Sequence, residues 1–453
     1  MTARENFGSR AAVIMAMAGS AIGLGNIWRF PYLAGENGGA AFIFIYIVFT
    51  LLLSLPIFLA ESVLGRRAGT NSRMAISSLI PGRAGKWLGL LTVITPLWIV
   101  SYYSVVGGWS LDYLFQACGL NFIHTPPEQL TGTFEAFIGR TWAPLACHLG
   151  FLLVTVFIVA FGVKAGIEKF SKICIPVLFL LIVLITVYSL SLPGASKGVE
   201  YLVKPDFSKV TGHTFLDALG QSFYSLSLGM GIILTYSSYV SKEENLMVAG
   251  VGTSVCDLLF AYLAGFAIMP AVFAAGIAPG SGPGLIFDTL PFIFSQMGQQ
   301  MPVLSSVAAI LFFLTILFAA LTSSVSLIEV GIAYLTETKG ISRRKACLWL
   351  FLLCGAFGTL ASLSFGPLKE VHVFGLQLFD FADSFASNVL LVAGGVLVVV
   401  LAGWVLPRQA LFDELTNNGT KKGNVKLFPV VYFLIRYVAP LGIGAMIVSL
   451  VLC

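Results

Sequence analysis

The chain has 453 residues, of which 57% are hydrophobic and 10% are charged, and its formal net charge is +5. A soluble protein of this length would divide into roughly two or three domains, but so apolar a composition predicts an integral membrane protein. The sequence contains no HExxH motif, no Walker-type motif and no metal-spaced cysteine cluster, which argues against an enzyme or an ATP-driven pump.

Eleven apolar runs are long enough to cross a bilayer, which takes about 20 residues in a helix. They lie near 9–33, 40–64, 87–117, 143–161, 170–192, 213–240, 246–277, 303–335, 346–364, 372–405 and 427–451. We therefore expect an all-α membrane protein with eleven transmembrane helices. The seven cysteines fall mostly within these runs and show no CxxC spacing, so neither a disulfide nor a metal site is expected.

The basic residues indicate the orientation of the chain. Nineteen of the 26 lysines and arginines lie near the N-terminus and in alternate connections, all on one side of the predicted spans. The positive-inside rule then places the N-terminus in the cytoplasm and the C-terminus outside. Two connections carry further expectations. Segment 285–297 reads as a short external helix pair, either a lid or a static cap, and 407–426 as an internal linker of low order.

Two of the spans contain glycine-rich interruptions, at residues 19–26 (GSAIGLGN) and 225–231 (SLSLGMG). Hydrocarbon cannot satisfy free backbone groups, so such breaks persist where they line a cavity or a ligand site. Each break lies in the first span of one predicted half, 1–192 or 193–406. Each half has five spans, so the two would form an inverted repeat. Residues 407–453 hold the linker and the eleventh span. The pairing favours a midplane binding site over simple close helix packing.

Ionisable residues within spans are rare and usually functional. Arg29, Glu61, Asp257, Glu329 and Asp380 all fall within the predicted spans. Arg29 and Asp380 are candidates for a charged pair near the external mouth. Glu61 has a structural alternative, as a buried acid that hydrogen-bonds the break in the first span.

The eighth span carries four hydroxyl side chains: Thr322, Ser323, Ser324 and Ser326. Hydroxyls at this spacing either bond the carbonyls of the preceding helical turn or, beside a broken helix, supply neutral oxygen ligands to Na⁺. Both interpretations remain open from the pattern alone.

A family resemblance joins these features. Residues 19–31 (GSAIGLGNIWRFP), followed by Glu36-Asn-Gly-Gly39, resemble the first-span signature of the neurotransmitter:sodium symporters. Residues 220–229 resemble the sixth span of that family and 321–324 its eighth. The resemblance runs in order from residue 4 to about 400, and it is strongest to eleven-span bacterial members that carry hydrophobic amino acids in the bacterial inner membrane.

The resemblance implies two coupling sodium ions, no further cofactor, and neither a nucleic acid nor an obligate protein partner. The first sodium site would be formed by Ala21, Asn26, Ser225 and Asp257. The second would be formed by Gly19, Ile22, Ala319, Thr322 and Ser323. The implied substrate site comprises Ala21, Gly23, Gly25, Ile99, Tyr103, Tyr224, Ser225, Ser227, Met230, Ser324, Ser326 and Leu327.

The resemblance also implies moving parts. Arg29 and Asp380 would form the outer gate, above a lid made by Tyr224, while Arg4 and Glu337 would form the inner gate. Phe7 stands where the family commonly has a tryptophan. Gly166 and Pro176 match a family motif for local unwinding of the fifth span. Glycine gives the backbone conformational freedom and proline lacks an N–H donor, so both residues would make it easier for the helix to unwind.

Departures from the family pattern refine the expected substrate. Asp257 stands where many members have asparagine, and Ala261 where chloride-dependent members have serine, so chloride-independent transport is expected. Gly23 replaces the aspartate of monoamine carriers, so the ligand should bring its own carboxylate. With flexible Met230 in the pocket, we expect neutral aliphatic and aromatic amino acids. The alternative is a transport-deficient amino acid sensor of the same fold.

Overall fold

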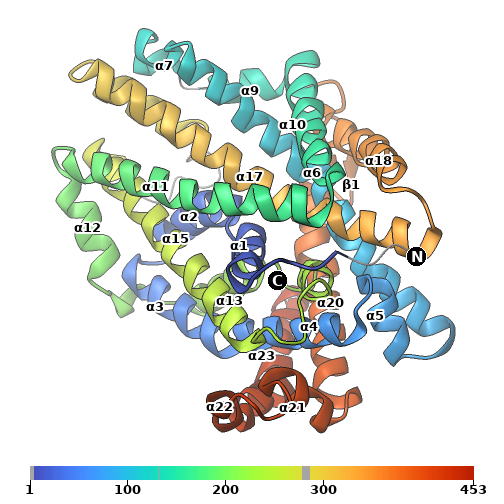
Figure 1. The fold of residues 1–453 in the computed structure, drawn as a ribbon. Coiled ribbons are helices and arrows are strands. Elements are labelled where there is room, and N and C mark those ends of the chain that lie inside the picture. Colours follow the sequence, from blue (N-terminus) through green and yellow to red (C-terminus); the bar gives the residue numbers. More distant parts are fainter. Residues whose placement is uncertain (1–4, 131, 278–285, 453) are drawn as a thin grey trace.

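The protein is described by a computed structural model that covers residues 5–130, 132–277 and 286–452. The chain is mostly helical, and η marks a short π or 3₁₀ turn. The first five spans are α1 (Arg10–Ala21) with η1 (Gly25–Arg29) and α2 (Phe30–Glu36), α3 (Ala40–Phe49) with η2 (Thr50–Ser54) and α4 (Leu55–Ala68), α6 (Gly82–Cys118), α10 (Trp142–Ala160), and η3 (Val163–Glu168) with α11 (Lys169–Ser191) (Figure 1).

The remaining spans follow in chain order. They are α13 (Gly212–Ser225) with α14 (Ile232–Ser237), α15 (Leu246–Ala274), α17 (Pro302–Lys339), α18 (Arg343–Leu363), α19 (Leu378–Phe385) with η6 (Ala386–Leu390), α20 (Leu391–Val400) and η7 (Leu401–Val405), and α22 (Lys422–Phe433) with η8 (Leu434–Val438) and α23 (Ala439–Leu452).

Shorter elements connect these spans. They are α5 (Ser72–Leu79), α7 (Asn121–His124), α8 (Pro127–Leu130), α9 (Thr133–Ile138), α12 (Ala195–Val203), η4 (Phe207–Lys209), α16 (Thr289–Gly298), α21 (Arg408–Thr416), and the antiparallel strands β1 (His372–Val373) and β2 (Leu376–Gln377). Leu285 lies outside the described residues. From Ile286 onward, the predicted helix pair is the single helix α16.

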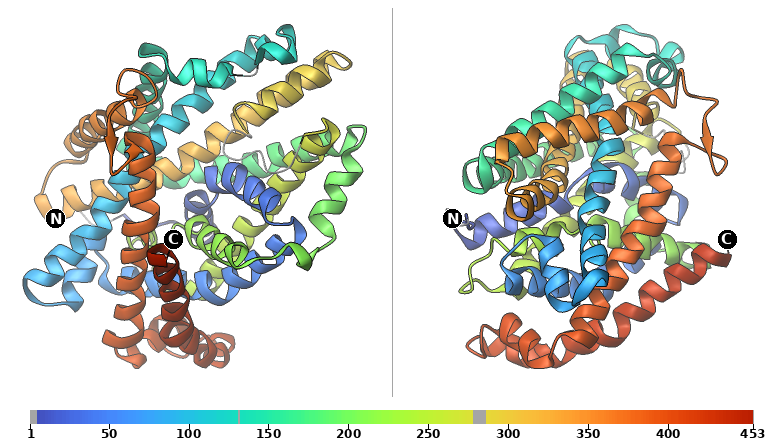
Figure 2. Two further views of the ribbon diagram at one scale, coloured as in Figure 1. Left: turned by 180° about the vertical axis from the view of Figure 1, so that it is seen from behind. Right: turned by 90° about the vertical axis from the view of Figure 1, so that its right-hand side faces the viewer.

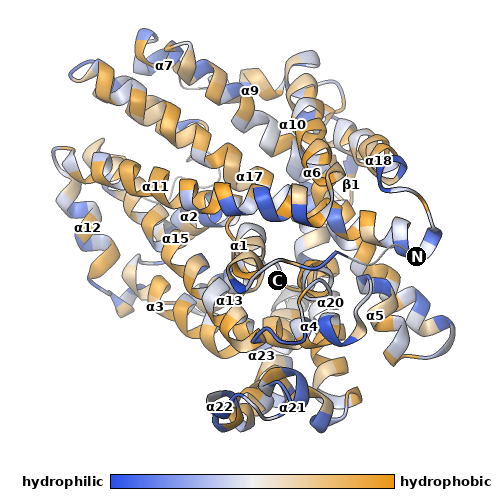
Figure 3. Ribbon diagram, in the orientation of Figure 1, coloured by the Kyte–Doolittle hydropathy of each residue, from blue (hydrophilic) through white to orange (hydrophobic). Residues whose placement is uncertain are grey.

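The structure confirms the expected architecture of eleven spans. In the described residues, nine continuous helical segments are long and apolar enough to cross a bilayer, and the bent pair at 10–36 makes a tenth. The eleventh is the pair α13 and α14, which six residues, 226–231, separate. Hydrophobic residues cover most of the helices, and hydrophilic ones gather on α12, α21 and α22 (Figure 3).

The first span is the centre of the packing. Helix α1 contacts α11, α14, α15 and α17, so its interrupted end is enclosed on several sides. The last span lies at the margin instead. Figure 2 shows α22 and α23 running along the outside of the molecule, and only 17% of the residues in the most apolar part of that span are buried.

Both predicted interruptions are present. The first span bends by 55° between α1 and α2. In the second break, Ser227, Gly229 and Gly231 have φ values of 56°, 76° and 73°, in the left-handed region that glycine tolerates best. A Cβ atom on Gly229 would lie 2.4 Å from the Leu391 carbonyl oxygen, so close contact with the tenth span also requires glycine there.

The expectation of low order at 407–426 is wrong. Helix α21 anchors the segment, because Glu414 accepts hydrogen bonds from Arg66 Nε at 2.7 Å and from Lys242 Nζ at 2.5 Å. The Arg66 and Glu414 side chains are both buried. Because separating a buried ion pair leaves an uncompensated charge, this pair holds α21 against α4. The polar run 417–419 forms a left-handed turn, with φ values of 50° to 78°, that ends α21.

Candidate functional site

The first predicted sodium cluster is assembled around Asp257, which is fully buried in α15. Asn26 Nδ2 donates to Asp257 Oδ1 at 2.7 Å, and Ser225 Oγ lies 2.8 Å and 3.0 Å from the two carboxylate oxygens. Ala21 is the last residue of α1, at the start of the break. The break thus brings residues from spans one, six and seven together.

Tyr46 completes this cluster and was not predicted. Its hydroxyl donates to Asp257 Oδ2 at 3.2 Å. All the hydrogen bonds described for the carboxylate therefore come from neutral side chains. A buried carboxylate held this way lacks the countercharge that usually stabilises it, and a cation at the same place would supply one. No local sequence signal marks Tyr46, because it sits in a wholly apolar run.

The second predicted cluster lies where α17 faces the end of α1. Thr322 Oγ1 is 3.4 Å from the Ile22 carbonyl oxygen and 3.0 Å from that of Ala319. Ser323 Oγ is 3.4 Å from the Ile22 carbonyl oxygen. A Cβ atom on Gly19 would lie 3.5 Å from Thr322 Cβ, so Gly19 belongs to the same group. Thr322 bonds its own helix, as the first interpretation expects, and also faces the break, so a role as a sodium ligand stays a prediction.

A small cavity of about 30 Å³ lies between the two breaks. Ten of the twelve predicted substrate residues line it: Ala21, Gly23, Gly25, Ile99, Tyr103, Tyr224, Ser225, Ser227, Met230 and Leu327. Ser20, Leu24, Ile232 and Ser323 also line it. Of these, Ser323 was assigned only to sodium and the other three were missed. Ser20 and Leu24 lie within the predicted first break. They would have been found if every residue of that break had been assigned to the cavity lining.

Two predicted substrate residues lie behind the cavity wall. Ser324 Oγ accepts a hydrogen bond from Thr155 Oγ1 at 3.1 Å. Ser326 Oγ accepts one from the Tyr236 hydroxyl at 2.8 Å and donates to the Thr322 carbonyl oxygen. Ser324 and Ser326 thus hold α17 against its neighbours and do not line the cavity, because helical rotation turns them away from it.

The part of the cavity next to Gly23 has no room for a side chain at that position. A Cβ atom on Gly23 would lie 2.5 Å from Ser323 Oγ and 3.2 Å from the Tyr103 hydroxyl. The Leu24 N–H donates to the same Tyr103 hydroxyl at 3.4 Å. An N–H group at the start of a half-helix and a phenol hydroxyl are donors that suit an anionic ligand group.

Glu61 supports the second break, not the first. Gly229 N–H donates to Glu61 Oε1 at 2.7 Å, and both groups are buried. The structural alternative for this acid is therefore right in kind, although the break it stabilises is the one in span six. The first break is supported elsewhere, where Gln221 Nε2 donates to the Gly25 carbonyl oxygen at 2.9 Å.

A larger cavity of about 490 Å³, which we call the vestibule, lies beyond Tyr224. The Arg29 guanidinium sits over the Tyr224 ring, 5.3 Å from its centroid. Asp380 and Asp383 both line this cavity together with Arg29. The predicted pairing of Arg29 with Asp380 stays a prediction, and Asp383 is a second candidate acid in the same cavity. Residues 380, 383, 384 and 387 are spaced so that they share one face of a helix, and two of them, Asp380 and Asp383, are acids. This spacing would have identified both acids as candidates for the outer gate.

The opposite end of the bundle is closed by aromatic and charged contacts. Phe7 is buried, with its ring edge-on to Tyr236 and Tyr239 at centroid distances of 5.8 Å and 6.1 Å. Glu337 accepts from the Asn71 N–H at 2.7 Å. Its predicted partner, Arg4, lies outside the described residues.

A further ion pair at this end joins Glu329 of α17 to Arg343 of α18. The Tyr239 hydroxyl also donates to Glu329, at 2.9 Å.

The predicted unwinding motif is helical in this structure. Gly166 lies in η3 and Pro176 inside α11, and the two elements are continuous from Val163 to Ser191. A Cβ atom on Gly166 would lie 2.3 Å from the Ile158 carbonyl oxygen, so glycine is needed there for close packing. Unwinding of this segment stays a prediction.

Comparison with known proteins decides the family. The model of the sodium:neurotransmitter symporter family matches residues 4–129 and 129–452. This chain belongs to that family. It is 38% identical over 443 residues to an "uncharacterized sodium-dependent transporter", YhdH of Bacillus subtilis, with 98% of this chain and 97% of the relative covered. It is 29% identical over 417 residues to the sodium-dependent serotonin transporter of Drosophila melanogaster, with 82% of this chain and 66% of the relative covered.

The fold agrees with a solved symporter structure. The crystal structure of MhsT in complex with L-phenylalanine is 40% identical in sequence and has a TM-score of 0.89, with 99% of this chain and 100% of that chain covered. The protein is therefore a membrane-integral, sodium-dependent symporter and not an enzyme, and sodium is its coupling ion.

The role of Glu61 can be tested through stability. Replacing it in Glu61→Ala leaves the buried Gly229 N–H without an acceptor, which should cost about 1–3 kcal/mol and lower the melting temperature of the purified protein. Glu61→Gln keeps an oxygen acceptor and should melt closer to the wild type. Equal melting of all three proteins would show that Glu61 does not stabilise the break.

Proposed function

We propose that this protein is a sodium-coupled symporter that imports neutral hydrophobic L-amino acids, both aliphatic and aromatic. The observation that carries the proposal is the surroundings of Gly23, where Tyr103 and Ser323 leave no space for an acidic side chain. A ligand must then bring its own carboxylate, which an amino acid does and a monoamine does not. The L-phenylalanine bound to MhsT supports the same substrate class.

The apolar part of the cavity supports the choice of side chain. Ile99, Met230, Ile232 and Leu327 line it, and none of them offers a charged partner. Methionine adapts to side chains of different shape, so several hydrophobic amino acids could be accepted by one site. The cavity holds about 30 Å³, so an aromatic substrate requires these side chains to move apart.

Two sodium ions complete the proposed site. One would bind among Asn26, Ser225 and Asp257 and contact the substrate carboxylate. The other would bind between the Ile22 carbonyl and the hydroxyls of Thr322 and Ser323. Oxygen ligands of this kind suit hard cations. Each positive charge that enters with the membrane potential contributes about 2.3 kcal/mol per 100 mV, which can drive uptake against a gradient.

Transport would proceed by alternating access between the halves 1–192 and 193–406. The vestibule, with Arg29, Asp383 and the Tyr224 lid, would be the outer gate, and Arg4 with Glu337 the inner one. Loosening of the fifth span near Gly166 would hydrate the second sodium site and release its ion. The protein would lie in a bacterial inner membrane with its N-terminus in the cytoplasm, as the distribution of basic residues supports.

Uptake into proteoliposomes tests the function directly. With sodium outside, labelled leucine should accumulate, and unlabelled phenylalanine, tryptophan and isoleucine should compete, whereas serotonin should not. Replacing sodium with potassium should abolish accumulation. Saturable binding without accumulation would indicate the sensor alternative, and indifference to all large hydrophobic amino acids would refute the substrate assignment.

The charge of Asp257 predicts the response to chloride. Because a buried carboxylate can balance a sodium ion, replacing chloride with gluconate should leave uptake unchanged. Asp257→Asn removes that charge and should raise the sodium concentration for half-maximal uptake by about tenfold or more, the scale of a lost charged interaction. A steep loss of wild-type uptake in gluconate would contradict the prediction.

The second sodium cluster can be tested with a matched pair on one helix. Thr322→Val keeps the side-chain shape but removes the hydroxyl that faces Ile22, and we expect the sodium dependence to shift to higher concentrations. Thr315→Val is the control, because its hydroxyl bonds only the Leu311 carbonyl of its own helix. Similar shifts in both variants would assign the effect to helix stability instead of sodium binding.

A further inference from the structure

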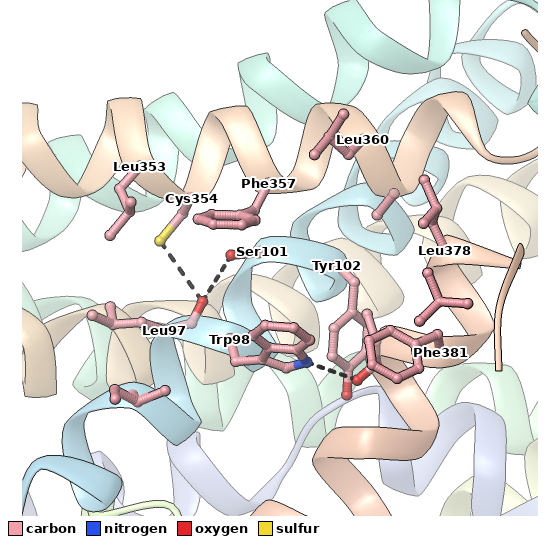
Figure 4. Close-up of a pocket in the computed structure, with 14 residues that line it drawn as sticks. Leu97, Trp98, Ser101, Tyr102, Leu353, Cys354, Phe357, Leu360, Leu378 and Phe381 are labelled. Carbon is pink, nitrogen blue, oxygen red and sulfur yellow. Dashed lines mark hydrogen bonds between the residues drawn. The ribbon is translucent and has the colours of Figure 1, made fainter. Parts of the chain in front are cut away.

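A third cavity, of about 360 Å³, lies between α6, α18 and α19 (Figure 4). We call it the α19 groove. Its rim belongs to the outer surface of membrane-spanning helices, since Leu353, Phe357 and Leu360 of α18 are 47% to 51% exposed while lining it. In a bilayer, the medium that meets these side chains is hydrocarbon. The groove is therefore open to lipid.

Helix α19 is a thin wall between this groove and the vestibule. Leu378, Phe381 and Ala382 line the groove, whereas Phe379 and Asp383 line the vestibule. None of the eight residues of α19, all of which are described, is fully buried. Helices in proteins are stabilised mainly by packing of an apolar face. On its groove side, α19 lacks much of that packing.

Few contacts hold α19 in place from the groove side. Trp98 Nε1 donates to the Ala382 carbonyl oxygen at 2.9 Å, and its ring lies 5.4 Å from the Phe385 centroid and 6.3 Å from that of Phe381. Tyr102 lines both cavities, and its ring lies 5.7 Å from that of Phe379 in α19. Whatever fills the groove thus contacts Trp98 and Tyr102, which pack against α19, the helix that carries Asp383.

We propose that the α19 groove binds the acyl chain of a membrane phospholipid, and that this chain holds α19 in position at the outer gate. Such a chain would supply the missing contacts, each small but numerous in a fitted groove. Binding would therefore link lipid composition to the gate. The contact with lipid does not depend on which substrate is carried.

The chemistry of the lining favours an acyl chain over a polar ligand. Ser101 Oγ donates to the Leu97 carbonyl oxygen at 2.8 Å, the Cys354 thiol points at the same oxygen at 3.8 Å, and the Trp98 N–H is used by Ala382 (Figure 4). These groups are already committed within the protein. An amino acid would leave its ammonium and carboxylate without partners there, at a high cost.

Photo-crosslinking tests the binding. The full-length protein is placed in nanodiscs of a phospholipid that carries a diazirine midway along one acyl chain, and adducts are mapped by mass spectrometry. We expect severalfold more adducts on residues 94–102 and 353–361 than on 427–433, a lipid-facing stretch outside the groove. Equal yields at both places would overturn the proposal, as would loss of groove adducts on adding leucine, which would make the groove a substrate site.

Variants on α18 provide the matched comparison. Ala361→Phe fills the groove and should remove its adducts, whereas Leu348→Phe adds the same kind of bulk on a lipid-facing position outside it and should change nothing. Leu360→Trp, at a more exposed lining position, serves if Ala361→Phe does not fold. Groove adducts that survive in a folded filling variant would also overturn the proposal. These measurements need no transport, so they stand apart from the substrate assignment.

The link to the gate has its own test. Wild-type uptake in proteoliposomes should differ between short-chain and long-chain phospholipids. In Ala361→Phe the side chain replaces the acyl chain, so the difference should shrink strongly, while Leu348→Phe should retain it. An unchanged dependence on chain length in the filled variant would refute control of α19 by the groove.

Discussion

The constraint on which the structure depends is that hydrocarbon offers no hydrogen bonds to a broken helix. Both breaks therefore require partners from within the protein, and they find them in different ways. Glu61 accepts the Gly229 N–H, Gln221 donates to the Gly25 carbonyl oxygen, and the Ser227 hydroxyl donates to the Ser20 carbonyl oxygen at 2.9 Å. The last of these joins one break to the other. The two interruptions are thus one structural unit.

The same constraint explains why chemistry gathers at this place. Backbone groups that remain after this internal pairing lie close to the Asp257 carboxylate and to the hydroxyls of Thr322 and Ser323. The hydrogen bonds described for Asp257 come from Asn26, Ser225 and Tyr46, which are neutral. A site that is fully buried and short of positive charge favours a cation and a zwitterion together, because each offsets the desolvation cost of the other.

The breaks and the spans could be predicted from the residues themselves because they are local features, whereas the site residues outside the breaks were implied by the family resemblance. Glycine-rich runs and apolar lengths identify the two interruptions and the eleven spans without knowledge of packing. What failed depends on rotation about a helix axis. Ser324 and Ser326 have the right chemistry but face away from the cavity. The order of α21 was missed because its anchor, Arg66, lies 348 residues away from Glu414.

The two sides of the short helix α19 face different cavities. Toward the vestibule it carries Asp383, which in the proposed outer gate would approach Arg29 on closure. Toward the membrane it presents apolar residues to a groove that the protein itself does not fill. A fully packed groove side would hold α19 as firmly as the core helices and oppose the small shifts that gating requires. In our proposal an acyl chain holds α19 in position without fixing it as firmly as a core helix, which makes the surrounding bilayer part of the proposed gate.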